Sequence, residues 1–281
     1  MTIKLPYFDY LMDAFAKGHS GLEQSFGHHV HWGYWPFPAQ AKGDSTDFVA
    51  AAEQLSELIY HSAKVTNSQA VLDVGCGFGG TIAALNQRYQ DMDLVGLNID
   101  ERQLLRAREQ VLPSGTNRIR FQQGDACALP FADHSFDVVL AVECIFHFPS
   151  REQFFKEANR VLKPGGYLAL SDFLLSPKLA KLSDFSFSGY LTDGFFGKCN
   201  VQFTRQDYQA LADNSGFSLA LEKDITLNTL PTYPYLRSLA KQPAGLKISL
   251  KQGISMVSAI LSVEFLSRVN ALQYFVYAFR K

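Results

Sequence analysis

The sequence predicts an α/β protein built on a doubly wound, mostly parallel sheet of seven strands. Three observations carry this prediction. Short apolar, β-rich segments alternate with helical patterns from residue 67 to residue 175. The first apolar segment, residues 70–74, runs into a glycine-rich turn and then a helical pattern, which is how a βαβ unit begins. The last, residues 272–279, arrives without a crossover helix, so we expect the last strand to be antiparallel.

Hydrophobic periodicity and turn residues place the individual elements. Strands are expected at residues 70–74, 93–100, 120–126, 135–142, 167–173, 217–227 and 272–279. Helices are expected at residues 47–64, 81–89, 101–112, 151–162, 204–214 and 231–268. The 47–64 helix follows capping residues at 45–47 and carries an apolar stripe, so it should lie on the sheet.

Four regions are predicted along the chain. Residues 1–66 form an N-terminal helical lid and a sheet-packing helix, and residues 67–175 form the ligand-binding core. Residues 176–203 form an aromatic cap, and residues 204–281 form the remainder of the sheet with a helical insertion at 231–268. Aromatic residues are abundant in the lid and the cap, which favours segments that close over a pocket. For the cap, a helical pair that completes the core stays open as an alternative.

The glycine turn after the first strand predicts a nucleotide-like ligand. Glycines at 75, 77, 79 and 80 permit positive φ angles and let a ligand lie against main-chain N–H groups at a helix N-terminus. The spacing of Gly75, Gly77 and Gly80 also satisfies the dinucleotide fingerprint. Asp73, however, places a carboxylate at the strand end, where it suits a cationic group and repels a pyrophosphate.

Composition excludes several other classes of protein. A formal net charge of −1 without a long lysine and arginine run gives no electrostatic footprint for nucleic acid. The four cysteines have no paired metal spacing and no signal peptide is evident, which together indicate a reducing cytoplasm. No apolar run is long enough to cross a bilayer, so stable membrane insertion is not expected.

A loop at residues 28–36 combines three histidines with three aromatic residues. His28, His29 and His31 lack a further ligand at a suitable spacing, so we expect no metal. Aromatic capping of a ligand is the preferred interpretation, and a surface loop stays open as the alternative.

Four motifs, in order along the chain, resemble those of one family. They are 71–79 (Val-Leu-Asp-Val-Gly-Cys-Gly-Phe-Gly), 124–126 (Gly-Asp-Ala), 136–139 (Phe-Asp-Val-Val) and 161–166 (Val-Leu-Lys-Pro-Gly-Gly). This set resembles the Rossmann-like class I S-adenosylmethionine-dependent methyltransferases over about residues 28–225. Residues 31–35 and 98–103 are similar to the small-molecule branch, which methylates sugars, polyketides, tocopherols and other lipophilic metabolites.

The resemblance implies S-adenosyl-L-methionine as the cofactor and assigns residues to its parts. Asp73 and the glycine turn would meet the methionine end, Asn98 and Gln103 the ribose, Ile99 and Ala126 the adenine faces, and Asp125 the adenine amino group. The expected binding set comprises Tyr34, Trp35, Asp73, Gly75, Gly77, Gly79, Asn98, Ile99, Gln103, Asp125, Ala126 and Glu143.

Three of these assignments need comment. Many relatives carry an acid where this chain has Asn98, although an amide can both donate to and accept from ribose hydroxyls. An exposed helix position stays open for Gln103. Tyr34 and Trp35 are expected to lay their rings against the sulfonium by a cation–π contact, with core packing as the alternative.

Two residues at strand ends are predicted to act on the methyl acceptor. In the O-methyltransferases that this chain resembles, a histidine and an aspartate occupy the positions of His147 and Asp172. The resemblance therefore implies His147 as general base and Asp172 as its helper. A packed histidine at a helix start stays open for His147.

The predicted function is O-methylation of a small, lipophilic acceptor by a cytoplasmic enzyme. C-methylation of an isoprenoid or another alkene, with Phe146, Phe148 and Phe173 around a carbocation, and N-methylation stay open. Two other classes are an NAD-dependent oxidoreductase that uses Asp100 at the ribose, which Asp73 disfavours, and a cofactor-binding protein without catalysis. The expected partner is the small-molecule acceptor, and a homo-oligomer is left open.

Overall fold

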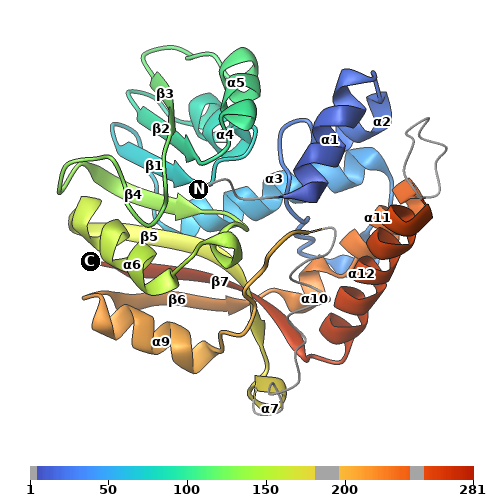
Figure 1. Ribbon diagram of the computed structural model, residues 1–281. Helices are drawn as coiled ribbons and strands as arrows, with labels where there is room; N and C mark the ends of the chain where they lie inside the picture. Colours follow the sequence, from blue (N-terminus) through green and yellow to red (C-terminus); the bar gives the residue numbers. More distant parts are fainter. Residues whose placement is uncertain (1–4, 181–195, 241–249) are drawn as a thin grey trace.

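A computed structural model describes residues 5–180, 196–240 and 250–281 of the chain. Its centre is one seven-stranded sheet with strand order β3-β2-β1-β4-β5-β7-β6 (Figure 1). The strands are β1 (Ala70–Val74), β2 (Asp93–Asn98), β3 (Arg118–Gln123), β4 (Phe136–Ala141), β5 (Leu162–Leu175), β6 (Ser218–Asp224) and β7 (Leu272–Arg280). Strands β1 to β5 pair in parallel, whereas β7 is antiparallel to both β5 and β6. The predicted fold class and the antiparallel last strand are confirmed.

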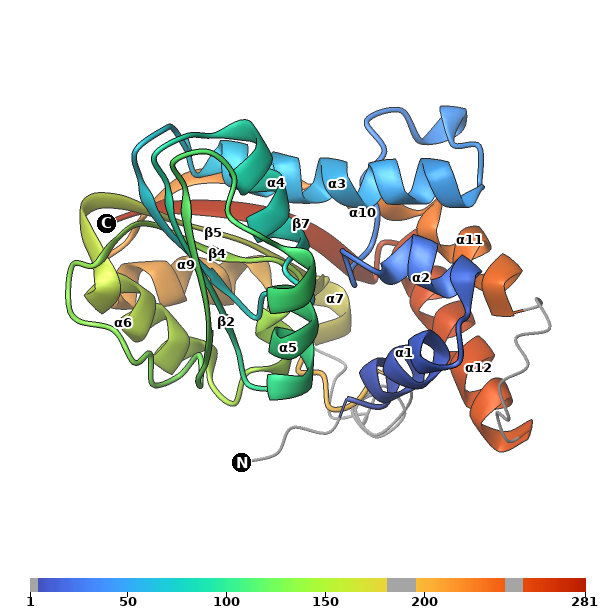
Figure 2. The same cartoon turned by 90° about the horizontal axis from the view of Figure 1, so that it is seen from above.

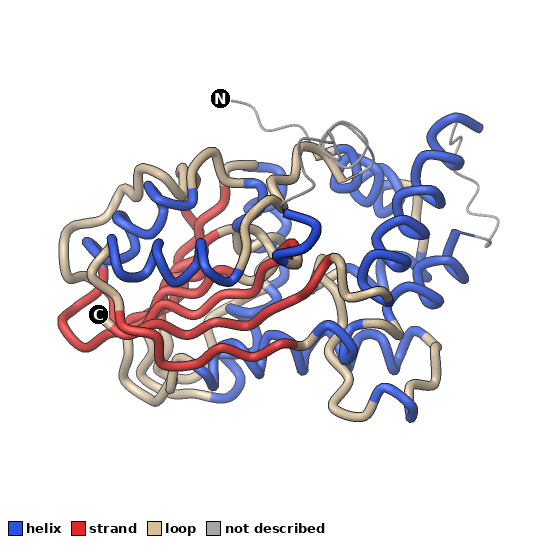
Figure 3. Tube along the Cα trace, turned by 90° about the horizontal axis from the view of Figure 1, so that it is seen from below, coloured by secondary structure: helices blue, strands red, loops and turns tan. Residues whose placement is uncertain are grey.

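Helices cover both faces of the sheet, as Figure 3 shows. The helices of the described residues are α1 (Pro6–Ala16), α2 (Ser20–Phe26), α3 (Ser45–Ser62), α4 (Gly80–Arg88), α5 (Glu101–Gln110), α6 (Arg151–Val161), α7 (Pro177–Ala180), α9 (Arg205–Asn214), α10 (Thr226–Thr229), α11 (Thr232–Ala240) and α12 (Leu250–Arg268), and only some of them lie on the sheet. Short 3₁₀ helices lie at η1 (Pro38–Gln40) and η2 (Ile145–His147).

Two separate hydrophobic clusters show which helices pack on which face of the sheet. On one face, Leu55 and Ile59 of α3 and Leu85 of α4 are fully buried in one cluster with side chains from β1, β4 and β7. On the other face, Phe155 of α6 and Tyr208 of α9 are fully buried in a second cluster. At about 25 cal/mol per Å² of apolar surface, this two-sided burial is the main stabilisation of the sheet.

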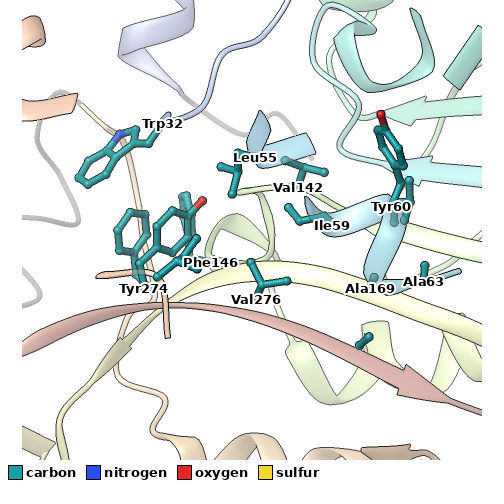
Figure 4. Packing of buried hydrophobic residues seen from close by; sticks show 14 of the residues in the cluster. Trp32, Leu55, Ile59, Tyr60, Ala63, Val142, Phe146, Ala169, Tyr274 and Val276 are labelled. Carbon is teal, nitrogen blue, oxygen red and sulfur yellow. The ribbon is translucent and has the colours of Figure 1, made fainter. Parts of the chain in front are cut away.

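Helices α1, α2, α11 and α12 gather past the sheet, on the side to which the parallel strands point (Figures 1 and 2). Figure 4 shows Trp32, Phe146 and Tyr274 at one end of the first cluster, with Tyr60 and Ala63 at the other. The fold therefore places a helical layer opposite the carboxyl ends of the parallel strands, where ligands bind in doubly wound sheets.

Element boundaries differ from the sequence prediction at several points. Strand β5 begins at Leu162 rather than at residue 167, because residues 163–166 form a bulge against β4 with Gly165 at φ +79°. Strand β6 ends at Asp224, whose carboxylate accepts the Thr226 N–H at 2.9 Å and so starts α10. Helix α3 is capped by Asp44, just before the predicted capping residues.

The other predicted regions are described only in part. The predicted helix at 231–268 contains α11 and α12, and residues 241–249 between them lie outside the described residues. So do residues 181–195 of the predicted cap. All four cysteines are free. Among the described residues, no helix is long and apolar enough to cross a membrane.

Candidate active site

Two adjoining cavities lie at the carboxyl ends of the parallel strands. The first, here called the polar cavity, encloses about 870 Å³ including its open mouth, and the glycine turn and the ends of β2 and β4 line it. The second, the apolar cavity, encloses about 1210 Å³ including its mouth, and aromatic and aliphatic side chains line most of it. The residues common to both linings are Tyr7, Val30, His31, Glu143 and His147. Two ligands placed in these cavities would meet at that shared wall.

The glycine turn leaves a bare stretch of backbone facing the polar cavity. Gly77 has φ +54°, and a Cβ added there would meet no heavy atom of the described residues within 4 Å. Gly75, at φ +74°, also lines the cavity, but its Cβ would lie only 2.7 Å from the Cys144 Cβ. Gly77 therefore lets a ligand approach the backbone, whereas Gly75 allows the turn to pack on the segment that follows β4.

Gly79 packs the turn against neighbouring elements, whereas the sequence predicted that it would contact the ligand. It adopts φ +84° as the N-cap of α4 and is not among the residues that line either cavity. A Cβ at this position would lie 3.1 Å from the Phe121 ring and 3.2 Å from the Ala107 Cβ. Gly79 therefore permits close packing of the turn on α5 and β3, and the predicted contact of Gly79 with the ligand is corrected.

Asp73 places a carboxylate in the polar cavity without a protein partner. The residue is 1% exposed, and no hydrogen bond to its carboxylate occurs among the described residues. Burial raises the pKa of Asp73 to about 8, because nothing nearby compensates the charged form. Such a carboxylate is suited to a cationic ligand group, as predicted from its position at the strand end.

Asn98 and Gln103 form one polar unit at the end of β2. The Asn98 Nδ2 donates to Gln103 Oε1 at 3.0 Å, and the Asp100 N–H donates to Asn98 Oδ1 at 3.0 Å. Gln103 is 1% exposed, and its Nε2 is a buried donor without a partner among the described residues. A buried amide donor left unpaired costs about 1–3 kcal/mol of free energy. A ligand hydroxyl group that accepted from this donor would remove that cost.

Three further predicted residues line the far end of the same cavity. These are Ile99 after β2, and Asp125 and Ala126 after β3. Asp125 also accepts the Cys127 N–H at 2.8 Å, which holds the turn that follows the strand. The structure thus brings together residues from the ends of β1, β2, β3 and β4, although these lie far apart in sequence.

Glu143 stands at the wall between the two cavities. Its backbone has φ +50°, a conformation that non-glycine residues rarely adopt and that often marks functional sites. Its carboxylate accepts the Trp32 N–H at 3.0 Å and the Tyr274 hydroxyl. Burial nevertheless raises the pKa of Glu143 to about 8, so this group too adds negative charge only at mildly alkaline pH.

His147 lies in the same wall, on the 3₁₀ turn that follows β4. Its Nδ1 is 3.1 Å from the Lys198 carbonyl oxygen, which can only accept, so the ring hydrogen sits on Nδ1. The Nε2 lone pair is then free to accept, and the Tyr7 hydroxyl donates to it at 3.4 Å. Burial lowers the pKa of His147 to about 4, so the imidazole is neutral above about pH 5.

Asp172 lines neither cavity, which corrects its predicted role as helper at the acceptor. Its side chain is 0% exposed and accepts from Arg151 Nε at 2.9 Å, from Arg151 Nη2 at 2.7 Å and from the Tyr208 hydroxyl. Successive residues of a strand point to opposite faces. Phe173 therefore points into the apolar cavity, whereas Asp172 points to the face covered by α6 and α9.

Tyr34 and Trp35 also lie outside the linings of both cavities. The Tyr34 hydroxyl accepts from Lys223 Nζ at 3.0 Å, and the Trp35 Nε1 donates to Asp47 at 3.0 Å. Trp35 packs with Phe48 in a small separate cluster. The predicted contact of these two rings with a sulfonium is corrected, because both are used for packing.

Sequence reasoning missed individual residues of the shared wall. Tyr7 on α1 lines both cavities and touches His147, but the pattern of residues 1–30 predicted only an aromatic lid. His31 also lines both cavities, and its clustering with His28 and His29 was the available signal. Among the described residues, no group of three or more histidine, cysteine, aspartate or glutamate side chains could hold a metal ion.

Comparisons with known proteins show the family and the fold of this chain. A family model described as a methyltransferase domain matches residues 72–170. The chain is 34% identical over 229 residues to the methyltransferase GfsG of Streptomyces halstedii, covering 79% of this chain and 77% of that protein. It is 32% identical over 223 residues to 27-O-demethylrifamycin SV methyltransferase of Amycolatopsis mediterranei, again covering 79% and 77%. A mycolic acid cyclopropane synthase complexed with SAH and CTAB shares the fold, with a TM-score of 0.77, 17% identity and 99% coverage of both chains.

Proposed function

The chain belongs to the S-adenosylmethionine-dependent methyltransferases that act on small molecules, and we propose that it methylates a hydroxyl oxygen of a lipophilic acceptor with His147 as general base. The observation that carries this proposal is the position of His147. Its neutral imidazole faces the wall where the polar and the apolar cavity meet.

The polar cavity fits the cofactor of this family. Asp73 offers an unpaired buried carboxylate to a cation, Gln103 Nε2 offers an orphan donor to a hydroxyl, and Gly77 leaves its backbone accessible. When bound, the cofactor supplies an electrophilic methyl group on a sulfonium. Asp73, Gln103 and Gly77 would hold it with that group toward the shared wall.

The apolar cavity is suited to a lipophilic acceptor. Its lining includes Trp32, Phe146, Phe173, Met256 and Ile260, with few polar groups away from the shared wall. Such a lining binds apolar surface and excludes water, so the acceptor is placed and desolvated by the same side chains. The name of the rifamycin relative likewise gives methyl transfer at an oxygen of a small molecule.

In this proposal His147 removes one proton. The acceptor O–H would donate to Nε2 and pass its proton there while the oxygen takes the methyl group from the sulfonium, whose sulfur would keep the electron pair of the broken C–S bond. Lys198 stabilises the resulting imidazolium, because its carbonyl already accepts from Nδ1. Tyr7 must turn its hydroxyl away or move when the acceptor takes its place at Nε2.

C-methylation is the second candidate, and the aromatic lining of the apolar cavity favours it. The ring centroids of Trp32 and Phe173 lie 4.8 Å apart, and those of Phe146 and Phe173 lie 5.7 Å apart. Aromatic faces stabilise a carbocation by cation–π attraction, which alkene methylation would need. The two relatives named above are both methyltransferases, which disfavours the oxidoreductase alternative.

Methyl transfer from cofactor labelled with ¹³C in the methyl group distinguishes these reactions. Lipophilic phenols and alcohols, isoprenoid alkenes and lipophilic amines are incubated separately with the enzyme, and the products are examined by NMR. We expect a methyl carbon signal typical of a methyl ether from the hydroxyl acceptors. A labelled methyl group bonded to carbon would favour the alkene reaction, and one bonded to nitrogen would reject both candidates.

The Gly77→Val substitution is expected to abolish binding of S-adenosylhomocysteine while the fold persists. The new side chain enters space that is open in the protein, so it opposes the ligand more than it opposes the core. Valine at φ +54° is strained, which costs stability of about 1–3 kcal/mol. Calorimetric titration measures binding and circular dichroism checks folding. A folded variant with native affinity would contradict the placement of the cofactor.

Cofactor binding is expected to release protons at pH 7. The pKa of Asp73 is about 8, so the free carboxyl group is mostly protonated at pH 7, and a bound ammonium group would lower that pKa. Affinity should therefore rise as the pH increases from 6 to 8 and then level off. Titration calorimetry in buffers of different ionisation enthalpy counts the protons. An Asp73→Asn variant that still released as many protons would contradict this role.

A further inference from the structure

The segment that holds the His147 ring has no regular structure of its own. Residues 199–203 belong to no helix or strand, so their path is fixed by contacts with other elements. The carbonyl of Lys198, just before them, accepts from His147 Nδ1 at 3.1 Å. Cys199 and Val201 line the apolar cavity. The position of this segment therefore affects both the His147 ring and the cavity wall beside it.

Arg151, the first residue of α6, contacts the same segment from outside both cavities. Its Nη2 donates to the Asn200 carbonyl at 2.6 Å, and its guanidinium carbon lies 4.3 Å from the centre of the Phe203 ring. The Asn200 N–H donates to the Phe146 carbonyl at 2.8 Å. A charged donor makes a hydrogen bond about twice as strong as a neutral one, so Arg151 makes the stronger of these two bonds to Asn200. The carbonyls that bind Arg151 and His147 are only two residues apart in the chain.

Asp172 fixes the guanidinium in this position. Its carboxylate accepts from Arg151 Nε at 2.9 Å, from Arg151 Nη2 at 2.7 Å and from the Tyr208 hydroxyl. Both side chains of the ion pair are 0% exposed, and Arg151 Nη1 has no partner among the described residues. A buried pair of this kind is often no more stable than two apolar side chains. Stability alone therefore does not account for the two charges, and what they add here is the contact with Asn200.

We propose that Arg151 is a positioning residue for His147: held by Asp172, it fixes residues 198–200 so that the Lys198 carbonyl keeps the imidazole hydrogen on Nδ1. The Nε2 lone pair is then available at the wall that the two cavities share. An imidazole with its hydrogen on Nε2 could not accept a proton there. This inference rests on the proposed function, in which His147 is the base.

The Arg151→Lys variant tests the contact with Asn200. A lysine keeps the positive charge beside Asp172, so the protein should fold, but one ammonium group lacks the planar fork that reaches both Asp172 and Asn200. Displacing a catalytic group by about 1 Å can cost about 10²-fold in rate. We therefore expect the single-turnover rate with a hydroxyl acceptor to fall about ten- to hundredfold, while the affinity for S-adenosylhomocysteine stays unchanged.

The double variant Arg151→Met, Asp172→Leu separates position from stability. Its urea midpoint should lie close to that of the wild type, yet it should show the same loss of rate, because residue 151 no longer donates to the Asn200 carbonyl. Arg160→Lys is the matched control. Arg160 also lies on α6, forms an ion pair and donates to two backbone carbonyls, but it lies outside both cavities. This control should keep the wild-type rate.

Nitrogen NMR of imidazole-labelled protein locates the ring hydrogen directly, and the His147 signals are identified by their loss in His147→Gln. We expect only the Nδ1–H form in the wild type and in Arg160→Lys, and a share of the Nε2–H form in both Arg151 variants. A wild-type rate or an unchanged Nδ1–H form in the Arg151 variants, or the same changes in Arg160→Lys, would overturn the proposal. Full turnover of His147→Ala would reject the proposed function instead, and the NMR measurement, which needs no turnover, would then decide the role of Arg151 on its own.

Discussion

Replacing His147 with alanine is expected to lower turnover of a hydroxyl acceptor by about 10²–10⁴-fold, the usual effect of losing a positioned general base. Affinity for S-adenosylhomocysteine should stay close to that of the wild type, because the groups proposed to bind the cofactor belong to Asp73, Gln103 and the glycine turn. The wild-type rate should fall only as the pH drops through about 4, since burial holds the pKa of His147 near that value. We therefore expect no loss of rate near pH 6.5, the ordinary pKa of a histidine side chain.

The matched control is His61→Ala, which removes an imidazole from α3 outside both cavities. Single-turnover rates report the methyl-transfer step, and titration reports cofactor affinity. Unchanged turnover in the His147 variant would reject the base and favour methylation at carbon or at an amine. A parallel loss of cofactor affinity would instead move His147 into the cofactor-binding shell.

The Asp172→Asn substitution is expected to destabilise the fold by about 3–5 kcal/mol, because it leaves the Arg151 guanidinium buried without its counter-charge. Both side chains are 0% exposed, and Tyr208 and the Asn200 carbonyl complete the network. Urea denaturation should show a lower midpoint with an unchanged slope. The role that the resemblance to O-methyltransferases implied for Asp172, help at the acceptor, predicts instead a loss of turnover at native stability.

A double variant separates these two roles. Replacing Arg151 with methionine and Asp172 with leucine removes both charges, and stability should recover most of the loss seen for Asp172→Asn. Phe173, on the opposite face of the same strand, keeps its place in the apolar cavity in all three proteins. Native stability combined with a large loss of turnover in Asp172→Asn would restore the catalytic assignment.

Much of the lining of the polar cavity was predictable because it depends on the ends of parallel strands. Asp73, Gly77, Asn98 and Asp125 each lie near or just beyond the end of a parallel strand, and parallel strands bring such positions to one edge of a sheet. The seven strands and the antiparallel β7 followed from the same periodicity. Local pattern and spacing therefore determine this part of the structure.

The incorrect predictions concern residues whose surroundings depend on segments that are distant in the sequence. Asp172 was assigned by its position at a strand end, but whether a residue faces the cavity depends on the pleat, and a shift by one residue reverses the face. Trp35 was assigned by its neighbours in a loop whose path is set by contacts with α3 and α11, such as Phe48 and Tyr235. The hydrogen bonds of His29 and His31 involve Glu53 and Ser56 of α3, which no local pattern places beside this loop.

Helix α1 borders both cavities. Tyr7 and Phe8 line the polar cavity, and Tyr7 and Leu11 line the apolar one, so a single helix covers both. Its ion pair between Asp9 and Arg102, at 2.8 Å, is solvent-exposed and contributes at most about 1 kcal/mol. If α1 moves as one unit, both products become able to leave in the same event, and that event sets the upper limit of the steady-state rate whenever methyl transfer is faster.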